Sequence, residues 1–514
     1  MNDLNLKQFD KGDLNNIEGK KLFLISFFPS YVSELYERYG YKGEIAGVFD
    51  PDEKKHGEKG AAGHKFTVRG MKEIHTCPEK SVLMITTGYF EEVFDGLKSM
   101  SVPETIDRNI YFLANKDTEY YLSYHKELKQ QPLRDIMVFR SSTGTWEYVP
   151  GMDYTDNAKA LFEYLLMHGF NRKYKLVWLV KDPSLYRDIE ETNENVSFIS
   201  FDWAVTDDEC NRRIYYENIC LAKYFFFTQA SAFCRLKREG QTRIQLWHGC
   251  GPKIERIPVR EEHHYEFRVV TSDYFADFHS SAFGLRGDQM MVTGLPKNDW
   301  LFHPLDNWRN LLEIPEGDKY VFWLPTFRNT YSVLNRLNTN IDSGIDDLQL
   351  FDNENMLAEM DEWLSEKRII LVIKQHPLQR SINPSERRYH NIVFLDNSQL
   401  DRNRLHINEI LGNADALISD YSSVSVDYLL TGRPIGFVTA DIEQYDKSRG
   451  LYKNKTESFF PGEMINSVDD MKRFLMHIVE GRDDMKGMRE KSTELLHKYT
   501  DDRSCERILS ILGI

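Results

Sequence analysis

Short apolar runs rich in β-branched and aromatic residues alternate with stretches of helical periodicity along almost the whole chain. Residues 158–166 place apolar side chains at helical spacing, Gly169 follows where a helix would stop, and residues 176–180 then read as a buried strand. Such alternation is typical of βα units that wind a parallel sheet, so we predict an α/β fold. The predicted strands are residues 22–27, 44–49, 82–86, 176–180, 224–227, 243–247, 269–271, 291–293, 320–324, 369–374, 392–395, 416–419 and 435–438.

The length of 514 residues corresponds to about three domains at ~150 residues each. A stretch rich in Pro, Asn and Gly, residues 301–319, separates two groups of predicted strands, which places a boundary near residue 315. We predict domains at residues 1–130, 131–315 and 316–514.

The first predicted domain has the strand and helix order of a nucleotide-binding βαβ domain but lacks its glycine-rich fingerprint. Ser26-Phe27-Phe28-Pro29-Ser30 stands where G-x-G-x-x-G would follow the first strand. Side chains there block the approach of a pyrophosphate to the backbone. We therefore interpret residues 1–130 as a degenerate Rossmann-like accessory domain.

Charge and cysteine usage limit the partners and the compartment. The net charge of −15 opposes sequence-independent binding to nucleic acid or anionic lipid. The six cysteines form no C-x-x-C pair and no zinc spacing, which indicates reduced thiols and no metal site. The polar amino terminus does not resemble a secretory signal, and no apolar run approaches the ~20 residues that span a bilayer. We predict a cytoplasmic protein.

A histidine follows the predicted strand 243–247. His248 is succeeded by Gly249 and Gly251, so that both the imidazole and the backbone could approach a substrate. Histidine is suited to removing a proton near neutral pH. The alternative is a histidine that only ends a strand, with glycines that serve a turn.

Two further polar clusters follow strands of the third predicted domain. Gln375, His376 and Pro377 come after residues 369–374, and a histidine before proline can equally be an ordinary turn. Histidines at strand ends of two domains are expected to face a shared cleft.

The other cluster follows residues 416–419. Ser422 and Ser423 open the next helix, whose unpaired N–H groups suit a phosphate, and Asp427 lies one turn further. The alternatives are serines that only cap the helix and an aspartate that faces solvent.

Two more loops supply polar side chains. Lys297, Asn298 and Asp299 follow the strand 291–293, whereas Pro325, Thr326 and Arg328 follow the strand 320–324. Lys297 and Arg328 are candidate cations for a phosphate in an acidic protein, although each can also be an ordinary loop charge.

Taken in order, these motifs resemble the CDP-glycerol glycerophosphotransferase family, the teichoic acid polymerases and primases. The resemblance covers residues 135–490 and rests on Trp247-His248-Gly249, Pro296-Lys297-Asn298-Asp299, Pro325-Thr326-Phe327-Arg328, His376-Pro377 and Asp420-Tyr421-Ser422-Ser423 with Asp427. It implies a GT-B architecture, a pair of Rossmann-like domains that face each other across a cleft, with the CDP-alditol held mainly by the carboxy-terminal one.

The resemblance also implies roles for single residues. His248 and His376 match the two catalytic histidines of the family, and Ser422 and Ser423 match positions that hold the CDP pyrophosphate. The loop after His248 reads Cys-Gly-Pro-Lys where many members have Thr-Pro-Leu-Lys, and Lys297 stands where arginine is usual. The complete implied set of substrate-binding residues is Gly249, Lys297, Asn298, Asp299, Pro325, Thr326, Arg328, Gln375, Pro377, Ser422, Ser423 and Asp427.

The activity implied is transfer of glycerol phosphate or ribitol phosphate from a CDP-alditol to a hydroxyl of a glycan or teichoic-acid-type acceptor, with release of CMP. The implied acceptor is lipid-linked, which places the protein peripherally on the cytoplasmic face of the membrane, and no cofactor or metal is expected. Two alternatives stay open: a GT-B glycosyltransferase that uses a nucleotide sugar, and a non-catalytic nucleotide-binding scaffold.

Overall fold

The computed structural model describes most of the chain. The described residues are 4–51, 55–100, 102–141, 153–228, 237–253, 264–326, 348, 350–351, 353–374, 389–451 and 456–514. The predictions for Arg328, Gln375, His376 and Pro377 lie outside them. In the part that is described, no helix is both long enough and apolar enough to cross a membrane.

The chain divides into two compact units. The first unit comprises Met1–Arg134, Phe201–Leu221 and Phe233–Gly240. The second comprises Asp135–Ser200, Ala222–Ala232 and Gln241–Ile514. The described residues form three sheets of mostly parallel strands, one in the first unit and two in the second, which confirms the α/β class.

The first unit contains a seven-stranded sheet in the order β1-β7-β6-β2-β3-β5-β4. Only the β4–β5 hairpin is antiparallel among its pairings. The strands are β1 (Asn5–Gln8), β2 (Lys21–Ile25), β3 (Ile45–Phe49), β4 (Gly57–Ala61), β5 (His64–Arg69), β6 (Ser81–Ile85) and β7 (Asn109–Phe112). The helices are α1 (Leu14–Ile17), α2 (Pro29–Glu37), α3 (Phe90–Ser99), α4 (Lys116–Leu128) and α7 (Glu209–Leu221). The predicted strands at 22–27, 44–49 and 82–86 are confirmed as β2, β3 and β6.

The second sheet has seven strands in the order β10-β9-β8-β11-β12-β13-β14. They are β8 (Arg134–Arg140), β9 (Lys175–Val180), β10 (Val196–Ser200), β11 (Ala222–Phe227), β12 (Thr242–Gln245), β13 (Phe267–Val270) and β14 (Met290–Val292). Its helices are α5 (Asp156–Met167), α6 (Arg187–Thr192), α8 (Asp273–Phe283) and, from the end of the chain, α17 (Ser504–Leu512).

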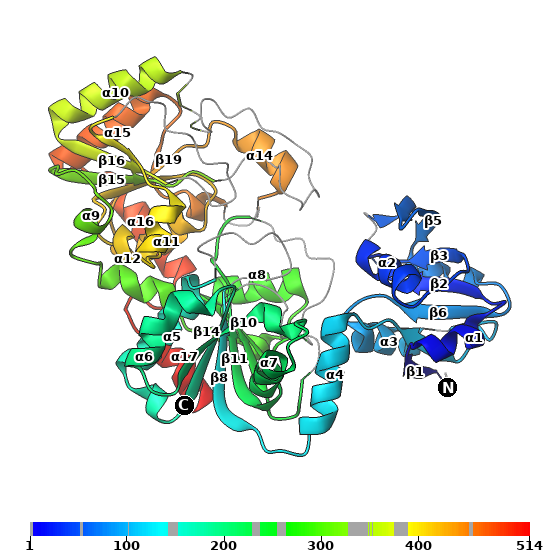
Figure 1. Cartoon of the computed structure of the whole chain (residues 1–514). Helices are drawn as coiled ribbons and strands as arrows, with labels where there is room; N and C mark the ends of the chain where they lie inside the picture. Colours follow the sequence, from blue (N-terminus) through cyan, green and yellow to red (C-terminus); the bar gives the residue numbers. More distant parts are fainter. Residues whose placement is uncertain are drawn as a thin grey trace. The chain divides into compact units, whose positions relative to one another are not determined.

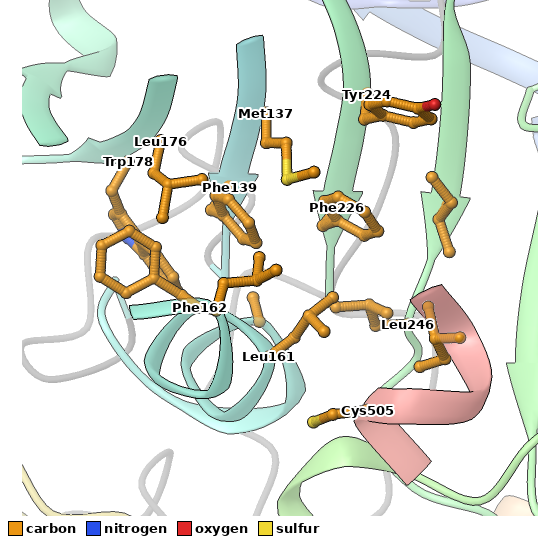
Figure 2. Packing of buried hydrophobic residues seen from close by; sticks show 14 of the residues in the cluster. Met137, Phe139, Leu161, Phe162, Leu176, Trp178, Tyr224, Phe226, Leu246 and Cys505 are labelled. Atoms are coloured by element: carbon orange, nitrogen blue, oxygen red, sulfur yellow. The ribbon is translucent and has the colours of Figure 1, made fainter. Parts of the chain in front are cut away.

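The core of this sheet lies between its strands and two helices. Figure 2 shows Phe139 of β8 and Trp178 of β9 packed against Phe162 of α5, with Phe226 of β11 beside Phe139 and Cys505 of α17 in the same core. The rings of Phe139 and Trp178 are stacked with centroids 5.6 Å apart. Because α17 contributes to this core, the last helix of the chain is tied to the second sheet.

The third sheet has six parallel strands in the order β17-β16-β15-β18-β19-β20. They are β15 (Lys319–Trp323), β16 (Ile369–Ile373), β17 (Ile392–Phe394), β18 (Ala416–Ser419), β19 (Ile435–Phe437) and β20 (Glu463–Met464). The associated helices are α9 (Trp308–Leu311), α10 (Glu354–Lys367), α11 (Asn397–Arg402), α12 (Ile407–Leu411), α13 (Val424–Tyr428), α14 (Ile442–Arg449), α15 (Val468–Glu480) and α16 (Lys486–Leu496).

Two helices pack on the same face of the third sheet. Leu357 and Met360 of α10 and Phe474 of α15 share one core with the strands (Figure 1). The strand β16 is apolar and buried along its whole length, as expected for a parallel sheet that is covered on both faces. The loops at the carboxyl ends of the strands are therefore left to carry polar side chains.

Candidate active site

His248 lies in a loop that leaves the second sheet with a strained backbone. After β12 the chain passes through Trp247, which has a φ of +60° in the left-handed region. Such a conformation disfavours a bulky residue by about 1–3 kcal/mol and persists only when the surroundings impose it. The N–H of Trp247 donates to Oε1 of Gln245 (3.0 Å), and its carbonyl accepts from Nδ2 of Asn157 (2.8 Å). The loop is therefore held on both sides of its strained residue.

The two glycines after His248 pack directly on the turn that follows β18. A β-carbon on Gly251 would lie 2.9 Å from Cβ and 3.0 Å from Cα of Ser423. A β-carbon on Gly249 would lie 2.3 Å from the Ser423 hydroxyl. These distances are too short for any side chain, so the glycines are what allow a loop of the second sheet and a turn of the third to meet.

Lys297 connects the His248 loop to α13, the helix that follows the Ser423 turn. It lies in a short 3-10 helix, Pro296–Phe302, after β14, and is buried. Its Nζ donates to the carbonyl of His248 (2.7 Å) and lies 3.5 Å from Oδ1 of Asp156 and 3.5 Å from Oδ2 of Asp427. Burial opposes its charge, but the two carboxylates hold the pKa of Lys297 above its ordinary value. Lys297 is therefore a bridge between loops, with its charge already met by protein carboxylates.

The two carboxylates lie on helices that accompany different sheets. Asp156 opens α5, also with a left-handed backbone, and burial raises the pKa of its carboxyl despite the nearby Lys297 ammonium. Asp427, on α13, is buried and accepts a hydrogen bond from Nδ2 of Asn298 (3.0 Å). The side-chain Oδ1 of Asn298 in turn accepts a hydrogen bond from Nδ2 of Asn408 (3.1 Å). Asp427 thus neither faces solvent nor extends freely toward a ligand.

Asn157 ties the His248 loop to the Lys297 loop. Its amide Nδ2 donates to the carbonyl of Trp247, and its Oδ1 accepts from the backbone N–H of Lys297 (3.0 Å). The side chain is fully buried. One amide therefore fixes the spacing of two loops that the sequence places far apart.

The imidazole of His248 is neutral in this setting. Burial, assisted by the charges of Lys297, Arg268 and Lys253, lowers the pKa of His248 to about 3. None of the described residues hydrogen-bonds its buried Nδ1. The ring lies against the indole of Trp247, with centroids 4.1 Å apart. A neutral imidazole that is half-buried at a loop can accept a proton from a bound hydroxyl.

The two predicted serines and the predicted loop after β15 lie at the ends of neighbouring strands, β18 and β15. Ser423 makes no side-chain cap to α13, whereas the Ser422 hydroxyl accepts a hydrogen bond from the N–H of Val424 (3.5 Å) at the start of that helix. Both serines are partly exposed. The capping alternative is therefore wrong for Ser423 but not for Ser422. Pro325 and Thr326 are buried at the end of β15, where the N–H of Thr326 donates to Asp420 (2.8 Å) and its hydroxyl also donates to that carboxylate. This pair joins the ends of β15 and β18.

Asp299 has a structural partner at the end of the chain. Its two carboxylate oxygens accept the backbone N–H groups of Ser504 and Cys505, each at 3.1 Å, at the start of α17. Burial raises the pKa of this carboxyl to about 6. In the described structure Asp299 anchors the last helix.

Sequence reasoning missed several residues of this network: Asp156, Asn157, Arg268 and Asn408. A signal existed for two of them, since Asp156 immediately precedes a helical apolar period and Arg268 is a charge within the apolar run Phe267–Val270. Within the described residues, no group of three or more His, Cys, Asp or Glu side chains is arranged to hold a metal ion.

Comparison with known proteins indicates the same family as the sequence motifs. The family model of CDP-glycerol:poly(glycerophosphate) glycerophosphotransferase matches residues 133–512. The teichoic acid poly(glycerol phosphate) polymerase of Staphylococcus epidermidis is 26% identical over 373 residues, which cover 68% of this chain and 46% of the relative. The teichoic acid ribitol-phosphate polymerase TarK of Staphylococcus aureus is 28% identical over 298 residues, 54% of this chain and 53% of the relative. This chain spans about half the length of these curated relatives.

Solved structures of the wall teichoic acid polymerase TagF share the fold. One of them aligns with a TM-score of 0.59 at 20% identity and covers 78% of this chain and 93% of that chain. The family model spans far more than half of the 514 residues and includes every loop of the site described above. The chain therefore belongs to the CDP-glycerol:poly(glycerophosphate) glycerophosphotransferase family.

Proposed function

We propose that this protein transfers an alditol phosphate, glycerol phosphate or ribitol phosphate, from a CDP-alditol to a hydroxyl of a teichoic-acid-type acceptor and releases CMP. The observation that carries the proposal is the junction of Gly249 and Gly251 with Ser423, because it places the neutral His248 beside the turn proposed to bind the donor pyrophosphate. The relatives named above, which act on glycerol phosphate and ribitol phosphate, support the donor class.

In the proposed reaction the acceptor oxygen forms a bond to the alditol-bearing phosphorus. The bond from that phosphorus to the oxygen of CMP breaks, and CMP leaves with the bonding electrons. The hydroxyl proton passes to His248, which must be neutral to accept it. Ser422, Ser423 and the backbone N–H groups of their turn donate hydrogen bonds to the donor phosphates. His376 is proposed to stabilise the departing CMP.

The remaining site residues are proposed to have supporting roles. Lys297, Asn298 and Asp427 hold the His248 loop and the serine turn at a fixed spacing. Pro325 and Thr326 shape the end of β15, and Arg328, Gln375 and Pro377 are proposed contacts of the donor. TagF structures carry a replacement of one or the other of two histidines, and some of these were soaked with CDPG, which supports the assignment of histidines to this chemistry.

We further propose a GT-B arrangement for the second unit. The domain of residues 131–315 would present the acceptor, and that of residues 316–514 would hold the CDP-alditol. Residues 1–130 would form the accessory Rossmann-like domain. A lipid-linked acceptor on the cytoplasmic leaflet would make membrane contact peripheral.

The decisive experiment is a donor panel. The purified protein is incubated with CDP-glycerol, CDP-ribitol, UDP-sugars and GDP-sugars and with short polyol-phosphate and glycan acceptors, and products are identified by mass spectrometry. CMP with an acceptor heavier by one alditol phosphate supports the proposal. Sugar transfer would establish a glycosyltransferase, and tight CDP-glycerol binding without CMP would establish a scaffold.

The pH dependence of this transfer is expected to lack the usual histidine step. Because burial and neighbouring cations lower the pKa of His248 to about 3, the free protein keeps its base neutral well below pH 6.5. The acid limb of kcat/KM that His248 causes is therefore expected below about pH 5. Donor phosphates favour the protonated ring, so the limb of kcat should lie at higher pH than that of kcat/KM. Initial rates of CMP release from pH 4 to 9 test this, and a kcat/KM limb near 6.5 would contradict it.

Substituting Gly251→Ala is expected to lower kcat by about 10- to 100-fold, because its β-carbon would displace the backbone of Ser423 and with it the alignment of base and donor. The measurement is the rate of CMP release at saturating donor.

The matched control is Gly487→Ala in α16, where a β-carbon meets nothing within 4 Å. This change should leave kcat unaltered. Equal rates for Gly251→Ala and the wild type would show that the two loops need not touch for catalysis.

A further inference from the structure

A buried arginine contacts the side chain of Trp247, the residue that precedes the proposed catalytic His248. Arg268 occupies β13, in register with Gln245 of β12, and its side chain is completely buried. The mechanism above assigns it no part. A fully buried guanidinium in a parallel strand requires a reason, since burying an ion is costly unless its surroundings compensate it.

The guanidinium lies against two aromatic rings. Its central carbon lies 3.7 Å from the ring centroid of Trp247 and 3.7 Å from that of Phe283, and the two rings meet edge to face with centroids 5.3 Å apart. The Nε donates to Nδ1 of His279 (3.0 Å), and one terminal nitrogen donates to the hydroxyl of Tyr265 (2.8 Å). Cation–π contacts of this kind are strongest when desolvated, and a planar guanidinium can lie flat on an aromatic ring as an ammonium cannot.

The same indole also contacts His248. The Trp247 and His248 rings are 4.1 Å apart, and no described residue holds the imidazole through Nδ1. The Trp247 ring therefore links Arg268 to His248 by direct contacts. The contacts of the indole with Arg268 and Phe283 also help to hold Trp247 in its left-handed conformation.

We propose that Arg268 is a positioning residue of the active site, which acts through Trp247 to hold the His248 imidazole in the orientation needed for proton transfer. The inference rests on the proposed function only in that His248 is taken as the base.

The charge of Arg268 adds a second effect. Four groups face His248 from the elements around it: Lys253 from its own loop, Lys297 from the 3-10 helix, Arg268 from β13 and the neutral His279 from α8. Asp156 and Asp427 both lie beside the Lys297 ammonium. Removing the charge of Arg268 should therefore favour protonation of His248 and raise its pKa.

Two substitutions distinguish the effect of Arg268 on the orientation of His248 from the effect of its charge on the pKa of His248. Arg268→Lys keeps the charge but loses the planar contact, so kcat is expected to fall about 10- to 100-fold while the titration of His248 stays at low pH. Arg268→Met loses both, so the same fall in kcat should be accompanied by a rise of about one unit or more in the pKa of His248. The titration is followed by NMR of the histidine ring protons, with the His248 signal identified by its loss in His248→Gln.

Phe283→Leu guards against failure of the Arg268 variants to fold. It removes one of the two rings that contact the guanidinium, leaves the charge in place and is expected to behave like Arg268→Lys. The control is Arg243→Met on the adjacent strand β12, where a buried guanidinium pairs with Glu266 (3.3 Å). That change should leave the His248 titration unmoved.

Wild-type kcat in any folded Arg268 variant, or an unmoved His248 titration in Arg268→Met, would overturn the inference. Because the titration requires no turnover, it reports on Arg268 even if every CDP-alditol fails as a donor. A failure of the proposed function and a failure of this inference are therefore distinguishable.

Discussion

Replacing His248 by glutamine is expected to reduce the rate of CMP release by about 10²–10⁴-fold, the contribution typical of a general base. Glutamine retains much of the size of imidazole and can still lie against Trp247, but it cannot accept a proton near neutral pH. The binding of CDP-glycerol should be nearly preserved, because the phosphates are proposed to contact the serine turn. Rates are measured with saturating donor, and binding is measured by calorimetry.

The matched control is His168→Gln. His168 follows α5 in the same unit and is exposed. Its ring forms a hydrogen bond with the carbonyl of Tyr164 (2.8 Å) and stacks on the Tyr164 ring, both within the same turn. This variant should turn over at the wild-type rate. A His248→Gln protein with wild-type kcat would remove His248 from the mechanism, whereas simultaneous loss of donor binding would reassign it to substrate binding.

Much of the fold was accessible from the sequence because parallel strands buried on both faces are continuous apolar runs. Residues 369–374 and 416–419 are of this kind and are confirmed as β16 and β18. The β4–β5 hairpin was missed because its strands consist largely of Gly, Lys, Glu and Thr and carry little apolar signal. The order of strands within each sheet could not be predicted, since it depends on which helices cover which face.

The site was predicted in part for a similar reason. His248 and Ser423 stand at strand ends, which in parallel sheets gather at one edge. The partnerships between them depend on packing that no local pattern records. Asn157 looks like an ordinary residue of a first helical turn, yet it fixes two distant loops. Arg268 had a visible signal, a charge within the apolar run Phe267–Val270, but nothing in the sequence indicated its aromatic neighbours.

The structure also changes the role proposed for Lys297. Lys297 was a candidate cation for a phosphate or an ordinary loop charge, but it is buried between Asp156 and Asp427. A cation that is already compensated adds little net attraction for an anionic donor. Its value lies in geometry, because it joins a carbonyl of one loop to a carboxylate of another.

Replacing Lys297 by methionine is accordingly expected to lower the free energy of unfolding by about 3–5 kcal/mol, the typical consequence of leaving buried carboxylates without their partner. Burial already raises the pKa of Asp156, and without the Lys297 ammonium this pKa would rise further. Asp156 would then take up a proton on folding, so the loss should be larger at pH 8 than at pH 5. Turnover should fall as well, because the His248 carbonyl loses its donor. Urea denaturation at the two pH values provides the measurement.

Two further variants separate lost charge balance from lost packing. Adding Asp427→Asn to Lys297→Met removes one orphaned carboxylate and should restore part of the stability, which lost packing alone would not allow. Lys498→Met breaks a pair with Asp273 in which both side chains are exposed, and such pairs contribute only about 0–1 kcal/mol. If Lys297→Met were no more destabilising than Lys498→Met, the buried bridge would not hold the two loops together, and the fixed spacing on which the proposed transfer depends would need another cause.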